Sequence, residues 1–195
     1  DPRRQRQMCI RDRYNIKTNN DIDVIVTNNS TLERNQKIFN VSAASLTGSS
    51  ITIHLGSSVI AETNSIFSNG AELTITNTGT IEATNSKAIN VSNSDGVSIT
   101  NNNNGVIKSN NNTILGDAGT GADNVTIDNS GEIYTTATGT ESSAIVFANN
   151  DTGNTITNNS GGEIYSSGSE STIVLGVSST LTNSGSIKNN KSVSN

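Results

Sequence analysis

The sequence LTITNTGTIEA at residues 73–83 decides the fold, because four variants of it follow along the chain. Each variant has an aliphatic residue two positions before an Asn, then a Gly, and a second aliphatic residue two positions after that Gly. The variants are VSITNNNNGVIKS (97–109), VTIDNSGEIYT (125–135), NTITNNSGGEIYS (154–166) and TLTNSGSIKN (180–189). Self-similarity of this kind is the signature of a repeat protein, in which each unit packs on its neighbours.

When the copies are aligned, their shared residues form columns. The Asn column, with spacings of 24, 28, 29 and 25 residues, consists of Asn77, Asn101, Asn129, Asn158 and Asn183. The first aliphatic column consists of Ile75, Ile99, Ile127, Ile156 and Leu181. The Gly column consists of Gly79, Gly105, Gly131, Gly162 and Gly185, and the second aliphatic column of Ile81, Ile107, Ile133, Ile164 and Ile187. A third aliphatic column consists of Ile89, Ile114, Ile145 and Ile173.

Two looser copies precede these repeats. In ITIHLGSSVIAE (51–62) we expect Ile53 in the first aliphatic column and Val59 in the second. Further upstream, FNVS (39–42) repeats the pattern of INVS (89–92). The repeat region is therefore expected to begin near residue 22.

Three short β-like pieces occur in every 22–29 residues. That unit is too short for a propeller blade, which uses roughly 40–45 residues, and it lacks the period of a helix. We predict an all-β fold, a right-handed, single-stranded, three-sided parallel β-helix of about six to seven rungs over residues 22–195. Because side chains alternate along a strand, Ile75, Ile81 and Ile89 are expected to point inward.

The Asn and Gly columns are expected at the corners of the coil. Gly and Asn tolerate left-handed backbone conformations best, so both columns are predicted near that region. Stacked Asn amides can also hydrogen-bond along the axis as a ladder. The alternative is that the Asn content merely reflects a low-complexity sequence.

Composition and charge divide the chain. Residues 1–13 hold five of the 12 basic and two of the 17 acidic residues, so residues 14–195 carry 7 basic and 15 acidic side chains, a net charge of −8. The first segment, which also contains Cys9, resembles a translated sequencing adapter; the alternative is a basic arm for nucleic acid or anionic lipid. Residues 14–21 are expected to be a disordered lead-in. The acidic remainder is not expected to bind nucleic acid.

Few residues suggest chemistry, and we predict no catalytic residue, cofactor or metal. His54, the one histidine, is expected at an outward strand position. AGTGADNVT (118–126) is close to a calcium-binding nonapeptide, but that motif requires tandem copies. Glu132 and Glu163 are expected side by side in adjacent rungs, beside Tyr134 and Tyr165. These four residues form a candidate ligand platform, and the simpler alternative is a cross-strand pair that only stabilises the sheet.

The motifs ITNTGTI (75–81), IDNSGEI (127–133) and LTNSGSI (181–187), with AINVS (88–92), resemble the β-helical passenger repeats of bacterial autotransporters. The resemblance implies a secreted stalk or adhesin, displayed on the bacterial surface, that binds a protein or glycan of a host or neighbouring cell. It also implies anchoring in the outer membrane by a C-terminal barrel absent from this sequence, which we expect to be an internal fragment. Two-partner-secreted adhesins carry similar repeats, so the secretion route stays open.

Two other classes of function are weighed. Parallel β-helices also include polysaccharide lyases and hydrolases and phage tailspike enzymes, which need clustered Asp with a basic residue beside a cleft. Insertions near 116–123 and 136–143 are the places where this chain could build such a cleft. The remaining alternative is a low-complexity tract without a fold, since only 31% of residues are hydrophobic.

Overall fold

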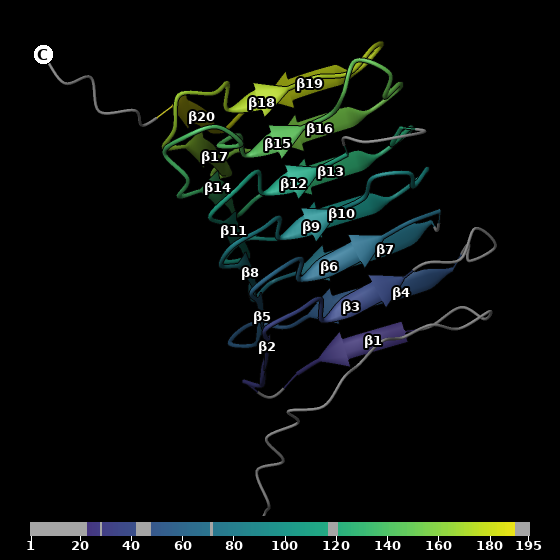
Figure 1. The fold of residues 1–195 in the computed structure, drawn as a ribbon, viewed down its shortest axis with the longest axis vertical. Helices are drawn as coiled ribbons and strands as arrows, with labels where there is room; N and C mark the ends of the chain where they lie inside the picture. The colour runs from purple at the N-terminus through teal and green to yellow at the C-terminus, as the bar shows by residue number, and fades with distance from the viewer. Residues whose placement is uncertain (1–22, 28, 42–47, 71, 117–120, 190–195) are drawn as a thin grey trace, which may run out of the picture.

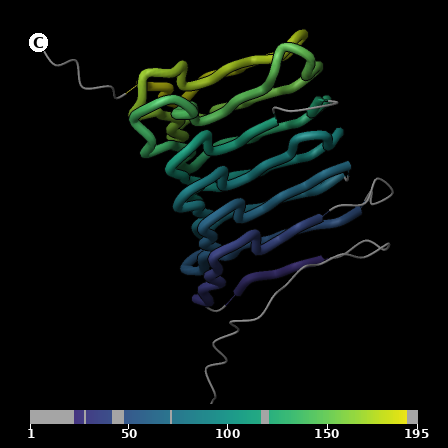
Figure 2. Tube along the Cα trace, viewed as in Figure 1, coloured from purple at the N-terminus to yellow at the C-terminus, as the bar shows by residue number. Residues whose placement is uncertain are grey.

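The computed structural model describes residues 23–27, 29–41, 48–70, 72–116 and 121–189. Over these residues the chain coils around a long axis, and each turn lies on the turn before it (Figure 1, Figure 2). The described residues form parallel strands in three sheets and contain no helix, which confirms the predicted all-β parallel β-helix. Accordingly, no helical segment in this part of the chain has the length and apolar character to cross a bilayer.

Each turn contributes one strand to each sheet, in the order A, B, C. Sheet A consists of β1 (Asp23–Val26), β4 (Ser49–Ile53), β7 (Leu73–Asn77), β10 (Ser98–Asn101), β13 (Thr126–Asn129), β16 (Thr155–Asn158) and β19 (Thr180–Asn183). Sheet B consists of β2 (Thr31–Arg34), β5 (Ser58–Ala61), β8 (Thr80–Ala83), β11 (Val106–Ser109), β14 (Glu132–Thr135), β17 (Glu163–Ser166) and β20 (Ser186–Asn189). Sheet C consists of β3 (Phe39–Val41), β6 (Ile66–Ser68), β9 (Ile89–Asn90), β12 (Ile114–Leu115), β15 (Ile145–Val146) and β18 (Ile173–Val174).

The predicted aliphatic columns are confirmed by the strand register. In sheet A, Ile75 pairs with Ile99, Ile99 with Ile127, and Ile127 with Ile156. The second and third columns pair in the same way in sheets B and C. Ile75, Ile81 and Ile89 are completely buried, so the three files meet in one interior. About six turns are stacked in this way.

The expected position of Ile53 is wrong. Ile51 pairs with Ile75, whereas Ile53 pairs with Asn77 and so occupies the Asn column. The corner between β4 and β5 is two residues longer than the corner between β7 and β8. Counting back from Val59 with the shorter corner therefore leads to Ile53 instead of Ile51. Val59 does pair with Ile81, as expected. The alignment of the chain's own repeats also missed β6, whose Ile66 pairs with Phe39 and Ile89.

Corners between sheets A and B occur in two lengths. Two residues suffice at 78–79, 130–131 and 184–185, while four residues are used at 54–57, 102–105 and 159–162. The longer corners place their third residue at positive φ, at 78° for Gly56, 70° for Asn104 and 88° for Gly161. The inserted pair therefore supplies the left-handed residue, and the prediction that the Asn and Gly columns themselves adopt this conformation is wrong.

The Gly column is instead explained by close approach between turns. A Cβ on Gly131 would lie 2.2 Å from the carbonyl oxygen of Gly105 and 2.6 Å from that of Asn102. On Gly105 it would lie 2.7 Å from the carbonyl oxygen of Asn77. The obstacles are backbone atoms, which cannot rotate away. Glycine is therefore required because only a hydrogen fits between one corner and the next.

Replacing Gly131 with Ala should destabilise the protein by about 3 kcal/mol or more, because the turn must separate from its neighbour to admit the methyl group. The matched control is Gly139→Ala, where a Cβ would meet nothing within 4 Å. Urea unfolding of both variants measures the difference. Equal unfolding free energies would show that the close approach is not what selects glycine.

The Asn column forms a continuous file of hydrogen bonds. Nδ2 of Asn77 donates to Oδ1 of Asn101 at 2.9 Å, and Asn101 donates to Asn129 at 2.8 Å. The file continues from Asn129 to Asn158 and from Asn158 to Asn183, each at 2.8 Å. Every donor points in the same direction along the axis. The first four of these residues are completely buried, so the file is part of the interior.

Each amide also joins two neighbouring turns. Asn101 Nδ2 lies 3.1 Å from the carbonyl oxygen of Gly105 in its own corner and 3.1 Å from that of Glu132 in the next turn. Asn77, Asn129 and Asn158 make the equivalent contacts. The carbonyl oxygen of Gly105 also accepts a hydrogen bond from the backbone N–H of Glu132, so the Asn amide adds a second contact between the same two turns.

Truncating Asn101 to Ala should cost about 2–4 kcal/mol, because Asn77 Nδ2 loses its acceptor, Asn129 Oδ1 loses its donor and a small cavity remains. Asn103→Ala is the control, since Asn103 is exposed in the same corner and should change stability by less than about 0.5 kcal/mol. Thermal and urea unfolding measure both. A loss for Asn101 no larger than for Asn103 would contradict a stabilising role.

Several predicted segments lie outside the described residues. These are the adapter-like segment 1–13, the lead-in 14–21, and residues 22, 28, 42–47, 71, 117–120 and 190–195 of the expected coil. The first described strand, β1, begins at Asp23.

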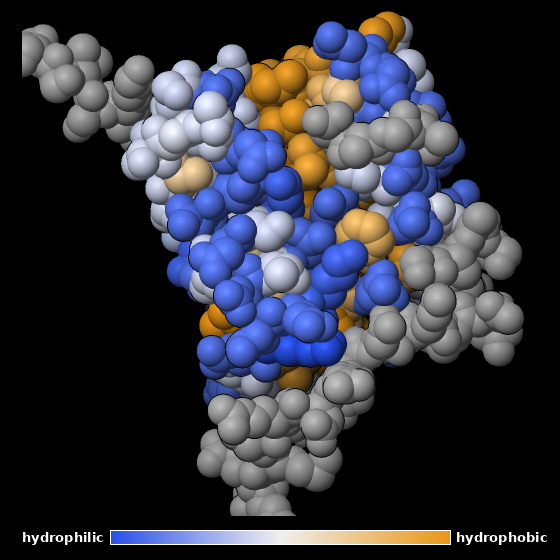
Figure 3. All heavy atoms as spheres, in the orientation of Figure 1, coloured by the Kyte–Doolittle hydropathy of each residue, from blue (hydrophilic) through white to orange (hydrophobic). Residues whose placement is uncertain are grey.

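The outer faces of the three sheets differ in chemistry. Sheet A presents mainly Thr and Ser, and sheet B presents ionisable and aromatic residues. Sheet C presents an apolar strip over β12, β15 and β18, formed by Leu115, Val146 and Val174 (Figure 3). Because successive side chains of a strand point to opposite sides of the sheet, these surfaces vary without disturbing the interior.

Candidate functional site

The candidate site lies on the outer face of sheet B, where two columns of side chains alternate with the buried aliphatic column. Glu82, Lys108, Tyr134, Tyr165 and Lys188 follow one another in the first column. In the second column, Glu132 pairs with Glu163. All four residues of the predicted ligand platform are therefore neighbours on one surface. Their side chains are held there because each precedes or follows a buried Ile.

The two tyrosine rings stack on each other. Their centroids are 4.5 Å apart and their planes differ by 7°. The contact covers one face of each ring, so each tyrosine has only one ring face left for a ligand. The other face of Tyr134 is turned toward the preceding turn, where Lys108 lies beside it in the sheet.

The hydroxyl group of Tyr165 donates a hydrogen bond of 3.5 Å to Oε2 of Glu132. Burial raises the pKa of Tyr165 well above its ordinary value, and the neighbouring Tyr134 and Glu132 raise it further. A neutral phenol is thus favoured at this position, which suits a hydrogen-bond donor better than a general base.

Ion pairs engage the charged side chains of this face. Lys108 Nζ lies 3.0 Å from Oε2 of Glu82 in the preceding turn. Lys188 Nζ lies 3.9 Å from Oε1 of Glu163. The two carboxylates of the platform thus have different partners, Tyr165 for Glu132 and Lys188 for Glu163. Glu163 is thus paired with a cation and Glu132 with a neutral phenol, so the two carboxylates do not form an isolated pair.

A groove of 310 Å³ opens beside Tyr134. It runs over three turns and is lined by Glu82, Ala83, Thr84, Lys108, Ser109, Asn110, Tyr134 and Thr136. Tyr165 does not line it, so the groove is bounded by the ring face of Tyr134 that the stack leaves open. Sequence comparison identified Tyr134, Glu82 and Lys108 as column neighbours, but the groove depends on Lys108 turning away from Tyr134 toward Glu82.

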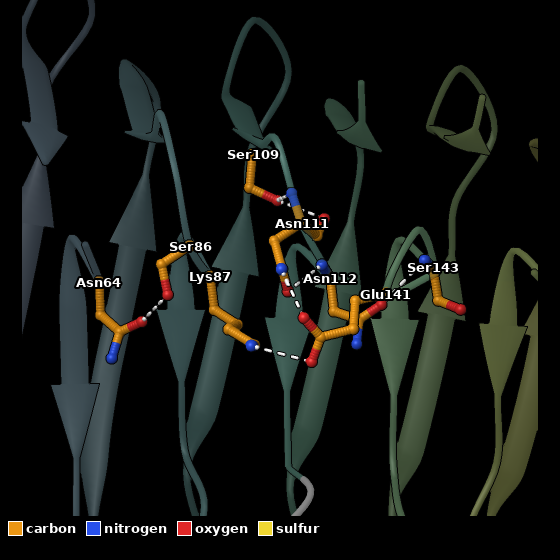
Figure 4. A network of polar contacts seen from close by, with 8 residues as sticks. All are labelled: Asn64, Ser86, Lys87, Ser109, Asn111, Asn112, Glu141 and Ser143. Atoms are coloured by element: carbon orange, nitrogen blue, oxygen red, sulfur yellow. Dashed lines mark hydrogen bonds and ion pairs between the residues drawn. The ribbon is translucent and has the colours of Figure 1, made fainter. Parts of the chain in front are cut away.

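The insertion at 136–143 forms no acidic cleft around this groove. Glu141, at a φ of 56°, faces back along the corner between sheets B and C. Its carboxylate lies 3.3 Å from Lys87 Nζ and accepts a 2.8 Å hydrogen bond from Asn111 Nδ2 (Figure 4). The Asn111 amide and the Lys87 charge hold the pKa of Glu141 below its ordinary value. Figure 4 shows these residues on successive turns, so Glu141 connects the corner between β14 and β15 to two earlier turns.

Two other candidate sites from the sequence are His54 and the calcium-like nonapeptide at 118–126. His54 is exposed, but it lies in the corner after β4 rather than on a strand. Residues 118–120 of the nonapeptide lie outside the described part of the chain. In its remainder, Asp123 accepts a hydrogen bond of 2.6 Å from the backbone N–H of Thr152. The described residues contain no group of three side chains suited to a metal ion.

Sequence comparison missed one buried carboxylate, Asp151. Its two oxygens accept hydrogen bonds from the backbone N–H groups of Ala122 at 2.8 Å and Ala148 at 2.7 Å. Asp151 is completely buried at the corner between sheets C and A. Asp151 therefore has a structural role, because these contacts join two turns of the coil.

Comparison of the chain with protein-family models, curated proteins and solved structures finds no match. The parallel β-solenoid is consistent with the passenger-like repeats of the sequence.

The raised pKa of Tyr165 predicts a loss of stability at high pH. A phenol whose pKa is higher in the folded protein favours folding below its unfolded pKa of about 10, and this contribution falls as pH rises above it. The slope should be at most about 1.4 kcal/mol per pH unit for one proton. Urea unfolding across this range should show a steeper decline for the native chain than for Tyr165→Phe. Parallel profiles would contradict the prediction.

Proposed function

We propose that this chain is part of the secreted passenger of a bacterial autotransporter, and that it serves as a rigid surface stalk with an adhesive face. The proposal is supported by the stacked solenoid together with the passenger-like repeats ITNTGTI and IDNSGEI. In such a stack each turn contacts only its neighbours, so length is gained by repetition and binding surfaces run along the side. The chain's place is then outside the cell, attached to its surface.

The groove beside Tyr134 is the proposed adhesive site, and its proposed ligand is a glycan of a host or neighbouring cell. One open aromatic face, an ion pair and several amide and hydroxyl groups line it. Aromatic faces pack on the apolar C–H surfaces of sugar rings, and a few placed polar groups fix orientation. The observation that carries this proposal is the open face of Tyr134 beside the Lys108–Glu82 pair.

Binding to a glycan array tests the site. Tyr134→Ser should lower binding at least tenfold, because it removes the wall of the groove. Tyr165→Ser is the matched control: it also removes one ring of the stack, but that ring does not line the groove. Equal losses in both variants, or binding unchanged in Tyr134→Ser with folding intact, would contradict the site. Cleavage of a bound glycan would favour the polysaccharide-active enzyme instead.

The secretion route has a separate test, the complete reading frame of the gene. A secretion signal upstream and an outer-membrane anchor downstream are expected. A frame that encodes neither would overturn the autotransporter assignment while leaving the glycan test intact.

A further inference from the structure

The outer face of sheet A carries a two-column array of small hydroxylated side chains. The column that precedes the first aliphatic file consists of Ser50, Thr74, Ser98, Thr126, Thr155 and Thr180. The column that follows it consists of Thr52, Thr76, Thr100, Asp128, Thr157 and Thr182. We call these two columns the threonine array. Six successive turns contribute to it, and every member is exposed or partly exposed.

The members of the array are nearly uniform in chemistry. Apart from Asp128, each carries a hydroxyl, and the array contains no Lys, Arg or aromatic side chain. Ser50 donates a 2.6 Å hydrogen bond to Asp23, and the carboxylate of Asp128 accepts one from Asn159. Within the described residues, no hydrogen bond engages the other hydroxyls of the array. These groups face outward, and in the threonine members a methyl group lies beside each hydroxyl.

The fold fixes the spacing of this array in two directions. Along the axis, adjacent strands repeat at about 4.8 Å, and across the sheet, residues i and i+2 repeat at about 6.7 Å. The register is unbroken from β4 to β19, so the array is a lattice rather than a cluster. Threonine also holds its χ1 angle tightly in strands, which keeps the hydroxyl and methyl groups in repeating positions.

A ligand that exploits such a surface must itself repeat in two directions. The shorter spacing of the array is comparable to one oxygen repeat on the prism face of hexagonal ice, and the longer spacing is about a tenth smaller than the perpendicular repeat. Hydroxyls can replace water molecules of that lattice, while methyl groups occupy the spaces between them. Charged side chains would disturb this match because they bind water in their own geometry. We propose that the threonine array is an ice-binding surface.

A polymer ligand fits these observations less well. Glycan and protein sites generally combine a hollow, an aromatic anchor and a few directed polar groups. The array contains no aromatic side chain and its hydroxyls repeat evenly, whereas the groove on sheet B combines a hollow, an aromatic ring and a few polar groups. The two faces therefore differ in the kind of ligand they suit, and the proposal for sheet A does not depend on the glycan site.

Ice recrystallisation and thermal hysteresis in solutions of the full chain test this inference. The native chain should inhibit recrystallisation at micromolar concentration and shape growing ice crystals. Thr100→Lys, in the centre of the array, should lower this activity at least tenfold. Thr80→Lys is the matched control, because Thr80 lies on the outer face of sheet B and pairs with Val106; its activity should equal that of the native chain.

Asp128 offers a test in the opposite direction. It interrupts the second column, so Asp128→Thr should raise ice activity by completing the array. Circular dichroism and the melting temperature verify that each variant is folded. Absence of ice shaping by the native chain, or equal losses for Thr100→Lys and Thr80→Lys, would overturn the proposal. A decrease in activity for folded Asp128→Thr would also count against it.

Discussion

Each turn of this protein makes its strand hydrogen bonds to the turn before and the turn after, so the stacking of turns is the constraint on which everything else depends. One close contact is at the corner between sheets A and B, where Gly131 meets the carbonyl oxygen of Gly105 with room only for hydrogen. The buried Asn amides bind corner carbonyls at the same place. Steric fit and hydrogen bonding therefore select the same register, and a slip by one residue would lose both.

Because the register is fixed at that corner, each outward position becomes a straight column. Tyr134 stacks on Tyr165 for this reason, and Lys108 reaches Glu82 for the same reason. The threonine array of sheet A, the ionic and aromatic face of sheet B and the apolar strip of sheet C are three products of one repeat. The interior is shared among them, whereas the surfaces are chemically independent.

The sequence pattern predicted the aliphatic columns and the residues beside them. Residues at the same distance from the repeated Asn or Gly occupy the same position in each turn of the coil. The pattern failed where the corner length changed, as at Ile53, since the longer corner, with Gly56 at positive φ, leaves no trace in the aliphatic pattern. The pattern also placed Tyr134 beside Tyr165 without showing which ring face stays open. That depends on side-chain direction, which a column cannot encode. The triplets TIT, SIT and TID contain the signal for the threonine array, because the residues on either side of each buried Ile face outward.

The one-way file of Asn amides has a consequence for how such a protein changes length. Every internal Asn accepts from the preceding amide and donates to the following one, so the sites are equivalent by translation. Duplication or excision of a whole repeat in the gene would rejoin a donor with an acceptor and leave no mismatched pair. The length of the coil can therefore drift during evolution by recombination between repeats, at little energetic penalty, while the cross-section stays the same.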